Sequence, residues 1–396
     1  MAPLLARCPG DTYRAMGLPE ALHASVRARI PGLAETVLGR LDLVRTPRGY
    51  ALLEFNTDVP GLFVEAFDVN RIVCMDARMP DANHGCESQL AHGLESAIAF
   101  ALDHLGLGSN ARRPRVAFAA AQGSLRDLDL ARYLAGLAHL PSDAGAQVPP
   151  GAAAVEVDTG VCAIEDLQAD GDGLYASDGA RIDVLFRLCP LLAFPFKRLR
   201  GAGGACGSTW IHLLDLVERR RLVLINPPSA GLLNSKAVQA VIWNLHRSGQ
   251  FFDPAEHALV EQHVLPSYLD PVFGDAPHVV KPACGRGGDT VRIVRGRQPA
   301  SGQAASTSYA GQPMVYQQYA PLPTARWMTE DGRRRLHVVA SCFAVNWEPA
   351  GICLRAGGPV TDESAWHVPM SVARTDSTAR LARGTSDHFS VPVRAM

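Results

Sequence analysis

The sequence predicts a mixed α/β protein with two or three lobes. Its 396 residues exceed the ~100–200 residues of a typical domain. Strand-like and helix-like segments alternate over residues 66–190, which is typical of a small α/β lobe. From residue 278 onward, short apolar runs of strand character dominate. Together these patterns favour an α/β lobe joined to a region that is rich in β-strands.

The elements are predicted from hydrophobic periodicity, taken from the N-terminus. A helix is expected over 13–37, where apolar residues recur at a spacing of four, at Leu18, Leu22, Val26 and Ile30. The next elements are a hairpin over 40–56, a helix over 87–106, a buried strand over 115–119, a helix that continues through Leu137, a strand over 222–225 and a helix from Asn234 to Gly249. The later strands are expected at 278–281, 290–294, 314–319, 336–347 and 350–355.

Breaks in this pattern divide the chain into regions. Residues 142–153 have the composition of a surface loop, and 201–207 form a glycine-rich break. The predicted regions are an N-terminal helix and hairpin that join the core (1–65), the α/β lobe (66–200), the β-rich region (201–375) and a polar tail without periodicity (376–396). We expect the tail to be disordered.

Composition and charge exclude several functional classes. Hydrophobic residues make up 47% of the chain and charged residues 19%, which argues against wholesale disorder. The formal net charge of −1 is not that of a polyanion-binding protein, so no nucleic-acid partner is expected. No apolar run reaches the ~20 residues of a spanning helix, and the N-terminus does not have the apolar length of a signal peptide. The nine cysteines form no CxxC pair, so we expect a cytoplasmic protein with free thiols and no membrane contact.

The hairpin over 40–56 gathers oxygen ligands on one face. A three-residue turn over 47–49 sets Asp42 opposite Glu54 and Arg40 opposite Asn56. Side chains two apart share a face, so these residues form one cluster, while the opposite apolar face is expected to be core. Two carboxylates and an amide oxygen are hard ligands that suit Mg²⁺. A surface hairpin with a cross-strand charge pair has the same pattern, and the residues alone leave both interpretations open.

Two lysines are placed to reach an anion. Lys281 ends a buried strand and precedes the loop Gly285-Arg286-Gly287-Gly288, whose backbone N–H groups are able to approach phosphate oxygens. The loop is not a Walker loop, and a glycine-rich hairpin turn without a ligand is the alternative. Lys236 is expected in the first turn of a helix capped by Asn234, where its charge opposes the helix dipole unless an anion is near. An exposed lysine at a cost of ~0.3–1 kcal/mol is the other interpretation. The buried stripe of that helix is predicted at Val238, Val241, Ile242 and Leu245.

Taken together, these segments resemble the synthetase domain of the glutathionylspermidine synthase family, an ATP-grasp group that forms peptide bonds. The matching stretches are Arg40-x-Asp42, Glu54-Phe-Asn56-Thr-Asp58-x-Pro60, Asn226-Pro-Pro with Asn234-Ser-Lys236, Val280-Lys281-Pro with Gly285-Arg286-x-Gly288, Tyr316-Gln317-Gln318-Tyr319-x-Pro321, Ala350-Gly351-Ile352-x-x-Arg355 and Val360-Thr361. Their order is that of the family, and they lie within residues 13–370. The sequence shows no counterpart of the amidase domain that some members carry.

The resemblance implies an ATP-grasp fold with an associated pre-ATP-grasp-like α/β lobe. It implies that two Mg²⁺ ions are bound by Asp42, Glu54 and Asn56. Arg40 and Arg355 would steady the transferring phosphoryl group and the acyl phosphate. The ATP phosphates would be held by Lys236, Lys281, Gly285, Arg286, Gly287 and Gly288. The adenine would be bordered by Gln317, Gln318, Tyr319 and Ala320, and Val360 and Thr361 are expected as further nucleotide-binding residues.

The sequence departs from the family where substrates are recognised. The family's Gly-Arg-Glu-Gly loop has Gly287 in place of the glutamate. Small hydroxyl residues are replaced by Val59-Pro60-Gly61, a paired acidic segment by Leu125-Arg126-Asp127, and an aromatic-and-glutamate cluster by Cys189-Pro190-Leu191-Leu192. In the family these positions are associated with glutathione and polyamine recognition, so a different substrate pair is expected.

The sequence therefore predicts an ATP-dependent carboxylate–amine ligase that forms an amide through an acyl phosphate. Its expected partners are ATP, Mg²⁺, a small carboxylic acid and an amine, and the sequence does not indicate an oligomeric state. Two alternatives stay open: an ATP-grasp binding or regulatory protein without turnover, and a small-molecule kinase that stops after phosphoryl transfer. Phosphate release that depends on an added amine separates the ligase from both.

Overall fold

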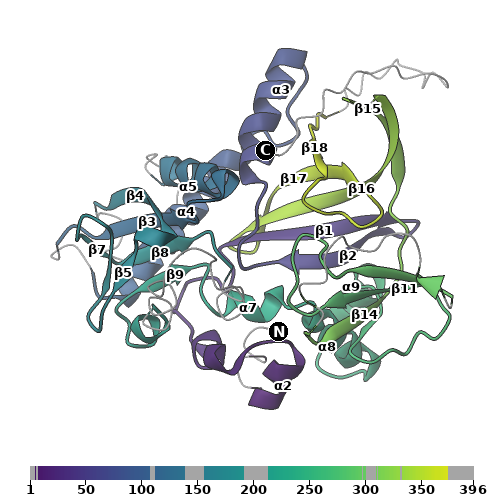
Figure 1. Cartoon of the computed structure of the whole chain (residues 1–396), viewed down its shortest axis with the longest axis horizontal. Helices are drawn as coiled ribbons and strands as arrows, with labels where there is room; N and C mark the ends of the chain where they lie inside the picture. Colours follow the sequence, from purple (N-terminus) through teal and green to yellow (C-terminus); the bar gives the residue numbers. More distant parts are fainter. Residues whose placement is uncertain are drawn as a thin grey trace.

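The structure is a computed structural model of the chain. It describes residues 5, 8–107, 112–138, 156–190, 213–296, 298–299, 309, 311–330 and 332–372. The loop predicted over 142–153, the glycine-rich break over 201–207 and the tail over 376–396 lie outside the described residues. Helices and strands are mixed throughout the rest (Figure 1), which confirms the predicted α/β class. Within these described ranges, no helix has the length and apolar character needed to cross a membrane.

The largest sheet in the described part of the chain is antiparallel and contains the N-terminal hairpin. Its strands are β1 (Leu38–Thr46), β2 (Gly49–Asn56), β15 (Thr324–Thr329), β16 (Gly332–Val345), β17 (Glu348–Gly357) and β18 (Trp366–Val368). They lie in the order β18-β17-β16-β1-β2, and β15 pairs with β16. Asp42 of β1 faces Ser341 of β16 across the ladder. Segments from opposite ends of the sequence therefore meet at the hairpin (Figure 1).

The turn of the hairpin is shorter than predicted. Thr46 pairs with Gly49, so the turn contains only Pro47 and Arg48, and the predicted three-residue turn is wrong. The Thr46 hydroxyl donates to the Gly49 carbonyl at 3.2 Å and accepts from the Arg48 backbone N–H at 3.3 Å. These local hydrogen bonds favour the tight turn, and Gly49 at φ +120 starts the second strand.

A β-bulge restores the predicted register at the cluster. The pairing shifts next to Asp42, and Leu53 is the extra residue without a partner in the ladder. Asp42 therefore does pair with Glu54, and Arg40 with Asn56, as predicted. The turn and the bulge each change the register by one residue, and the two changes cancel.

A second antiparallel sheet supplies the glycine loop. Its strands are β10 (Ser267–Tyr268), β11 (His278–Pro282), β12 (Arg292–Arg295), β13 (Gln298–Pro299) and β14 (Met314–Gln318), in the order β10-β14-β11-β12-β13. Helix α8 (Ala237–Arg247) packs on β10 and β14, and α9 (Pro254–His263) packs on α8 and β2. The predicted strands from residue 278 onward correspond to β11, β12, β14, β16 and β17. The short strands β15 and β18 were not predicted.

The α/β lobe is built on a parallel sheet. Its strands are β3 (Arg115–Ala120), β4 (Asp158–Ala163), β8 (Val184–Arg187) and β9 (Val223–Ile225), in the order β4-β3-β8-β9. Helices α4 (Cys86–His104) and α5 (Leu125–Leu137) match the predicted helices and pack together. Smaller elements complete the lobe and its link to the hairpin: β5 (Gln168–Ala169), β6 (Leu174–Tyr175), β7 (Arg181–Ile182), the helical turns η4 (Ile164–Asp166) and η3 (Val64–Val69), and α3 (Asn70–Ala77).

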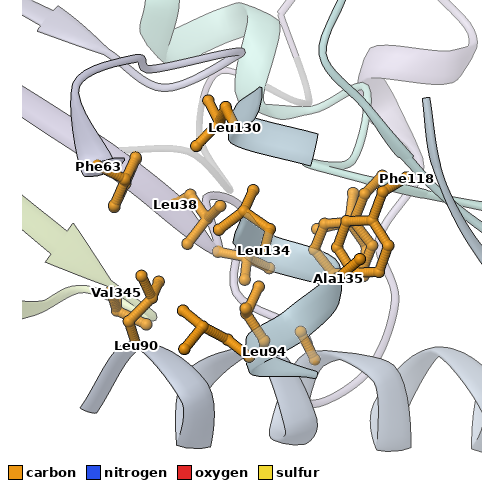
Figure 2. Close-up of a cluster of buried hydrophobic side chains, with 14 of the residues drawn as sticks. Leu38, Phe63, Leu90, Leu94, Phe118, Leu130, Leu134, Ala135 and Val345 are labelled. Carbon is orange, nitrogen blue, oxygen red and sulfur yellow. The ribbon is translucent and has the colours of Figure 1, made fainter. Parts of the chain in front are cut away.

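One apolar core joins this lobe to the hairpin sheet. Leu94 of α4 and Leu134 of α5 face each other in the cluster shown in Figure 2, and Phe118 of β3 closes one side. The same cluster includes Leu38 of β1 and Val345 of β16. Burying a leucine side chain contributes roughly 1.5–3 kcal/mol, so this core fixes the lobe against the strands that carry the polar cluster.

The continuous helix predicted over 13–37 is wrong. The segment contains α2 (Gly10–Ala15) and two single turns of 3-10 helix, η1 (Glu20–Leu22) and η2 (Ser25–Arg27). Gly17 adopts φ +77 and Pro19 follows it. Proline lacks the N–H of a helical hydrogen bond and restricts the residue before it, so the helix ends here. The apolar spacing instead reflects burial against α7 (Ala230–Asn234) and α8 in a second core cluster.

The start of α8 also differs from prediction. Asn234 ends α7 and does not cap α8; its side-chain oxygen accepts from the backbone N–H groups of Thr57 and Asp58 at 3.1 and 3.4 Å. Lys236 occupies the N-cap position. The buried residues of α8 are Ala237, Val238, Gln239, Ala240 and Trp243. Val238 is thus the only member of the predicted stripe that is fully buried, since the others, Val241, Ile242 and Leu245, are half-buried.

Candidate active site

The carboxylate of Asp42 is surrounded by hydrogen-bond donors. Arg40 donates to both of its oxygens, with Nε–Oδ1 and Nη2–Oδ2 distances of 2.8 and 2.9 Å. Ser341 donates to Oδ1 at 2.7 Å. Arg355 and Asn56 donate to Oδ2 at 2.8 and 3.2 Å. Burial raises the pKa of the Asp42 carboxyl, but the two arginines outweigh it and hold the pKa well below its usual range.

Glu54, next to this cluster, is paired with a lysine. Its Oε2 lies 3.2 Å from Nζ of Lys236, and the side chain is 30% exposed, whereas that of Asp42 is 2% exposed. Lys236 also donates to the carbonyl of Gly285 at 2.9 Å. Burial raises the pKa of Glu54, but the charges of Lys236, Lys281 and Arg40 together outweigh burial, and the net shift of the pKa is downward. Glu54 is therefore an ionised carboxylate that still has access to the cavity.

Lys281 is buried on the opposite wall. Its Nζ donates to the carbonyl of Leu53 at 2.7 Å and to Oε1 of Gln317 at 2.9 Å. Burial lowers the pKa of Lys281 to about 7, although Glu54 partly offsets this. An anion in the cavity would favour the charged form of this lysine.

Lysine is rare in this chain, and that rarity marks the site. Of 38 lysine and arginine residues, only Lys197, Lys236 and Lys281 are lysines. Two of the three line one cavity. The ammonium group is a compact point charge on a flexible stem, unlike the planar guanidinium. This composition is a clue that the sequence analysis did not use.

The glycine loop after β11 touches the segment between β17 and β18. Gly287 and Gly288 adopt φ +57 and +71, which L-residues rarely adopt. A Cβ atom on Gly288 would lie 2.9 Å from the Thr361 carbonyl oxygen and 3.0 Å from Val360 Cγ1. A Cβ atom on Gly287 would lie 3.1 Å from Cγ of Glu363. Both conformation and space therefore require glycine where the two loops meet.

All of the predicted site residues line a single cavity of about 240 Å³. They are Arg40, Asp42, Glu54, Asn56, Lys236, Lys281, Gly285, Arg286, Gly287, Gly288, Gln317, Gln318, Tyr319, Ala320, Arg355, Val360 and Thr361. Glu54 faces the cavity, while Phe55 packs near Trp347 with ring centroids 5.7 Å apart. The structure thus brings these side chains together, and the individual roles assigned to them stay predictions.

Part of the cavity lining is apolar. It consists of side chains from the two sheets and from segments next to them, namely Val279, Val291, Ile293, Leu322 and Val339. Residues 317–320 also line the cavity. Apolar walls beside a polar backbone edge are suited to a planar heterocycle.

Two polar atoms in the cavity wall are buried and unsatisfied. Within the described residues, Arg355 Nε and Thr361 Oγ1 have no hydrogen-bond partner. A buried donor left unpaired costs about 1–3 kcal/mol. Phosphate oxygens are strong acceptors for such groups, so the chemistry of this wall fits an anionic ligand.

The oxygen donors also fit a magnesium ion, with one constraint. Glu54 and Asn56 offer hard oxygens to the cavity. Asp42 already accepts five hydrogen bonds, and a carboxylate has about four lone-pair sites. It therefore binds a cation only after a donor such as Arg355 leaves. Across the described residues, no three His, Cys, Asp or Glu side chains form a metal-binding group, so the candidate set depends on the asparagine.

Sequence analysis missed several residues around the cavity. Ser341 interrupts the apolar run of β16, and Gln239 interrupts the apolar face of α8. A single polar residue in a buried stripe is a recognisable anomaly. Glu363 also lines the cavity, but nothing in its local sequence distinguishes it from a surface charge, whereas Arg126, which lines the cavity too, lies in the predicted substrate-recognition segment 125–127.

The family model described as "Glutathionylspermidine synthase preATP-grasp" matches residues 8–373, which confirms the resemblance inferred from the motifs. A search of curated sequences gives no significant match. The chain is similar to the solved structure of a glutathione synthetase-like effector from Globodera pallida, with a TM-score of 0.47, 12% identity and coverage of 91% of this chain and 84% of that chain. It is also similar to a putative γ-glutamylcysteine synthetase from Methylobacillus flagellatus, with a TM-score of 0.41, 11% identity and coverage of 89% and 82%. Because both scores lie below 0.5, only the family match supports a functional conclusion.

Proposed function

Since the chain belongs to the glutathionylspermidine synthase preATP-grasp family, we propose that it is an ATP-dependent ligase that joins a carboxylic acid to an amine. One observation carries this proposal. A cluster of arginines and carboxylates on the hairpin sheet and two of the chain's three lysines line the same cavity. Such an arrangement suits a triphosphate, whose transfer chemistry depends on positioning and charge stabilisation.

ATP binding is assigned to the second sheet and its glycine loop. Lys236, Lys281 and the backbone of 285–288 would neutralise the phosphates, and the apolar part of the lining together with 317–320 would take the adenine. The unsatisfied hydroxyl of Thr361 supports an anion near this loop. The contact between the two loops would exclude water, which protects an acyl phosphate from hydrolysis.

The reaction is proposed to proceed in two steps. An oxygen of the substrate carboxylate attacks the γ-phosphorus, an O–P bond forms, and the bond to ADP breaks. The amine nitrogen then attacks the acyl carbon, inorganic phosphate leaves, and the nitrogen loses a proton to solvent. Arg40 and Arg355 are assigned to the oxyanions that develop, because both line the cavity beside Asp42. No protein nucleophile is required.

Magnesium is assigned to the hairpin. Glu54, Asn56 and Asp42 would hold it, and bound Mg²⁺ would supply charge neutralisation for the phosphates. Asp42 is available only when one of its donors leaves. Arg355 is the best candidate for this exchange, because its Nε already lacks a partner among the described residues. Release of Arg355 from Asp42 would also free it to reach the phosphoryl group.

The proposed substrate pair differs from glutathione and spermidine. Val59 and Arg126 line the cavity where the family pattern has hydroxyl and acidic residues. The positive charge of Arg126 disfavours a polyamine, because like charges at one site repel. It favours an amine that also carries a carboxylate, such as an amino acid. The ion-pair partner described for Arg126 is the adjacent Asp127, whose Oδ1 lies 3.9 Å from the Arg126 Nε.

Two alternatives are tested in the same assay. The loss of a loop carboxylate at Gly287 favours a protein without turnover, but the side chain of Glu363 lies at that position from the opposite loop.

Phosphate release from ATP is measured with acid alone, amine alone and both, with mass spectrometry of the products. Release that requires both substrates supports the ligase. A stable phosphorylated acid without amine dependence identifies a kinase, and ATP binding without any release identifies a binding protein.

A further inference from the structure

Lys281 belongs to a closed ring of hydrogen bonds that includes a residue outside the cavity. Its ammonium group donates to the Leu53 carbonyl at 2.7 Å and to Gln317 Oε1 at 2.9 Å. Gln317 Nε2 donates to Gln239 Oε1 at 2.7 Å. Gln239 Nε2 closes the ring by donating to the same Leu53 carbonyl at 3.1 Å.

The ring connects elements from both sheets. Leu53 is the bulge residue of β2, Gln239 lies on α8, Lys281 is near the end of β11 and Gln317 lies on β14. Gln239 is 1% exposed and faces the core side of its helix. Burying an amide is costly unless its groups are hydrogen-bonded. Both ends of the Gln239 amide have partners within the ring.

The direction of each amide follows from its neighbours. The Leu53 carbonyl can only accept, so Gln239 must present its NH₂ group there and its oxygen to Gln317. Ser267 donates its hydroxyl to the Leu265 carbonyl at 2.9 Å and is thereby an acceptor for Gln317 Nε2 at 3.2 Å. Both neighbours of the Gln317 NH₂ group are acceptors. Its oxygen is therefore directed to Lys281.

We propose that Gln239 is a positioning residue for nucleotide binding, which orients the Gln317 amide and through it holds the ammonium group of Lys281 in place. It does not line the cavity, so it acts only through its partners. It also connects the carbonyl of Leu53, beside Glu54, to Gln317 on β14, the strand that pairs with the one that carries Lys281. The identity of the bound anion as a nucleotide phosphate rests on the proposed function.

The first experiment replaces Gln239 with methionine, which has similar length and no amide. MgATP affinity is measured by calorimetry on the full chain. We expect about tenfold weaker binding, because a misoriented Gln317 amide would no longer accept from Lys281, and this is the effect of losing one hydrogen bond to a charged group. The control is Gln262→Met, because Gln262 is exposed on the neighbouring helix α9 and does not line the cavity. An affinity within twofold of wild type in folded Q239M would overturn the proposal.

The second experiment identifies the route of the effect. In a double-mutant cycle with Lys281→Met, Gln239→Met should have little further effect on MgATP affinity, because its partner is already gone. Equal effects of Gln239→Met in both backgrounds would mean that it does not act through Lys281.

The third readout needs no nucleotide. The chain has only three lysines, so ¹³Cε-lysine NMR resolves Lys281, assigned with the K281M variant. In Q239M the Lys281 signal should move, while that of Lys236 should not. Lys236 directly precedes α8, so movement of both signals would indicate general loosening of the helix and overturn the proposal. Wild-type protein that binds no MgATP would instead contradict the proposed function, and the NMR result would still decide the positioning role.

Discussion

Replacement of Gly288 with alanine should open the contact between the two loops over the cavity. In the structure, Gly288 has φ +71, and a Cβ atom there would lie 2.9 Å from the carbonyl oxygen of Thr361. A methyl group at this distance from backbone forces one loop to shift. The loops belong to different sheets, so the shift separates the second sheet from the hairpin sheet where these loops line the cavity.

The cost of G288A has two parts. The left-handed conformation costs an L-residue about 1–2 kcal/mol. The contact with Thr361 adds to this as long as the loops stay closed. Only the contact distinguishes the closed form from the open one, and a contact cost of about 2 kcal/mol corresponds to roughly a thirtyfold loss in ATP affinity. The open form relieves the contact and keeps the left-handed strain, so the thermal midpoint should fall only by the amount that this strain accounts for.

The assay is the KM for ATP together with the thermal midpoint of each variant. Gly296→Ala is the matched control, because Gly296 has φ +65, and a Cβ atom there would meet no other atom within 4 Å. It shares the conformational strain and lacks the loop contact, so its KM should stay near that of wild type. A wild-type KM in G288A, or an equal rise in KM for G296A, would refute the role given to the loop contact.

The remaining predictions concern the cavity itself. Glu54→Gln should abolish turnover with the fold intact, because it removes the charge proposed to hold magnesium; unchanged ATP consumption means that the metal is held elsewhere. Lys281→Ala should mainly raise the KM for ATP and Arg355→Ala should mainly lower kcat, because the first contacts a phosphate throughout and the second meets charge that develops during transfer; identical kinetic defects count against this division. With a pKa of about 7, Lys281 loses its charge as pH rises, so kcat/KM for ATP should fall above neutrality in wild type and not in K281A. Glutathione and spermidine should be poor substrates, because unpaired charged groups are rejected strongly; rapid formation of glutathionylspermidine would overturn this.

Much of the fold was predictable from local pattern. Alternation over the hairpin, the period of α4 and α5 and the apolar runs from residue 278 onward each correspond to an observed element. Each of these signals depends on which face of one element is buried. The N-terminal segment failed because its spacing matched a helix while Gly17 and Pro19 interrupted the backbone. Apolar spacing indicates which residues are buried, whereas glycine and proline decide whether the backbone of the segment is helical.

The pairing within the hairpin was predicted correctly for an incomplete reason. The assumed three-residue turn was wrong by one residue, and the unseen bulge at Leu53 corrected it. This bulge leaves little signal in the local sequence, because its extra residue is a leucine among other apolar residues. The bulge is nevertheless useful to the site, since its carbonyl accepts from both Lys281 and Gln239.

The residues that sequence analysis missed are those whose role depends on partners far away in the sequence. Ser341 contacts Asp42 across 299 positions of sequence, and Gln239 meets Gln317 across 78. Neither partner is visible from the local pattern, yet both residues break an apolar stripe. A polar side chain is retained in such a stripe only if its buried groups are satisfied. In this chain, both Ser341 and Gln239 bond to residues that line the same charged cavity. A polar residue that interrupts a predicted core face therefore indicates a place where a second element contributes to the site.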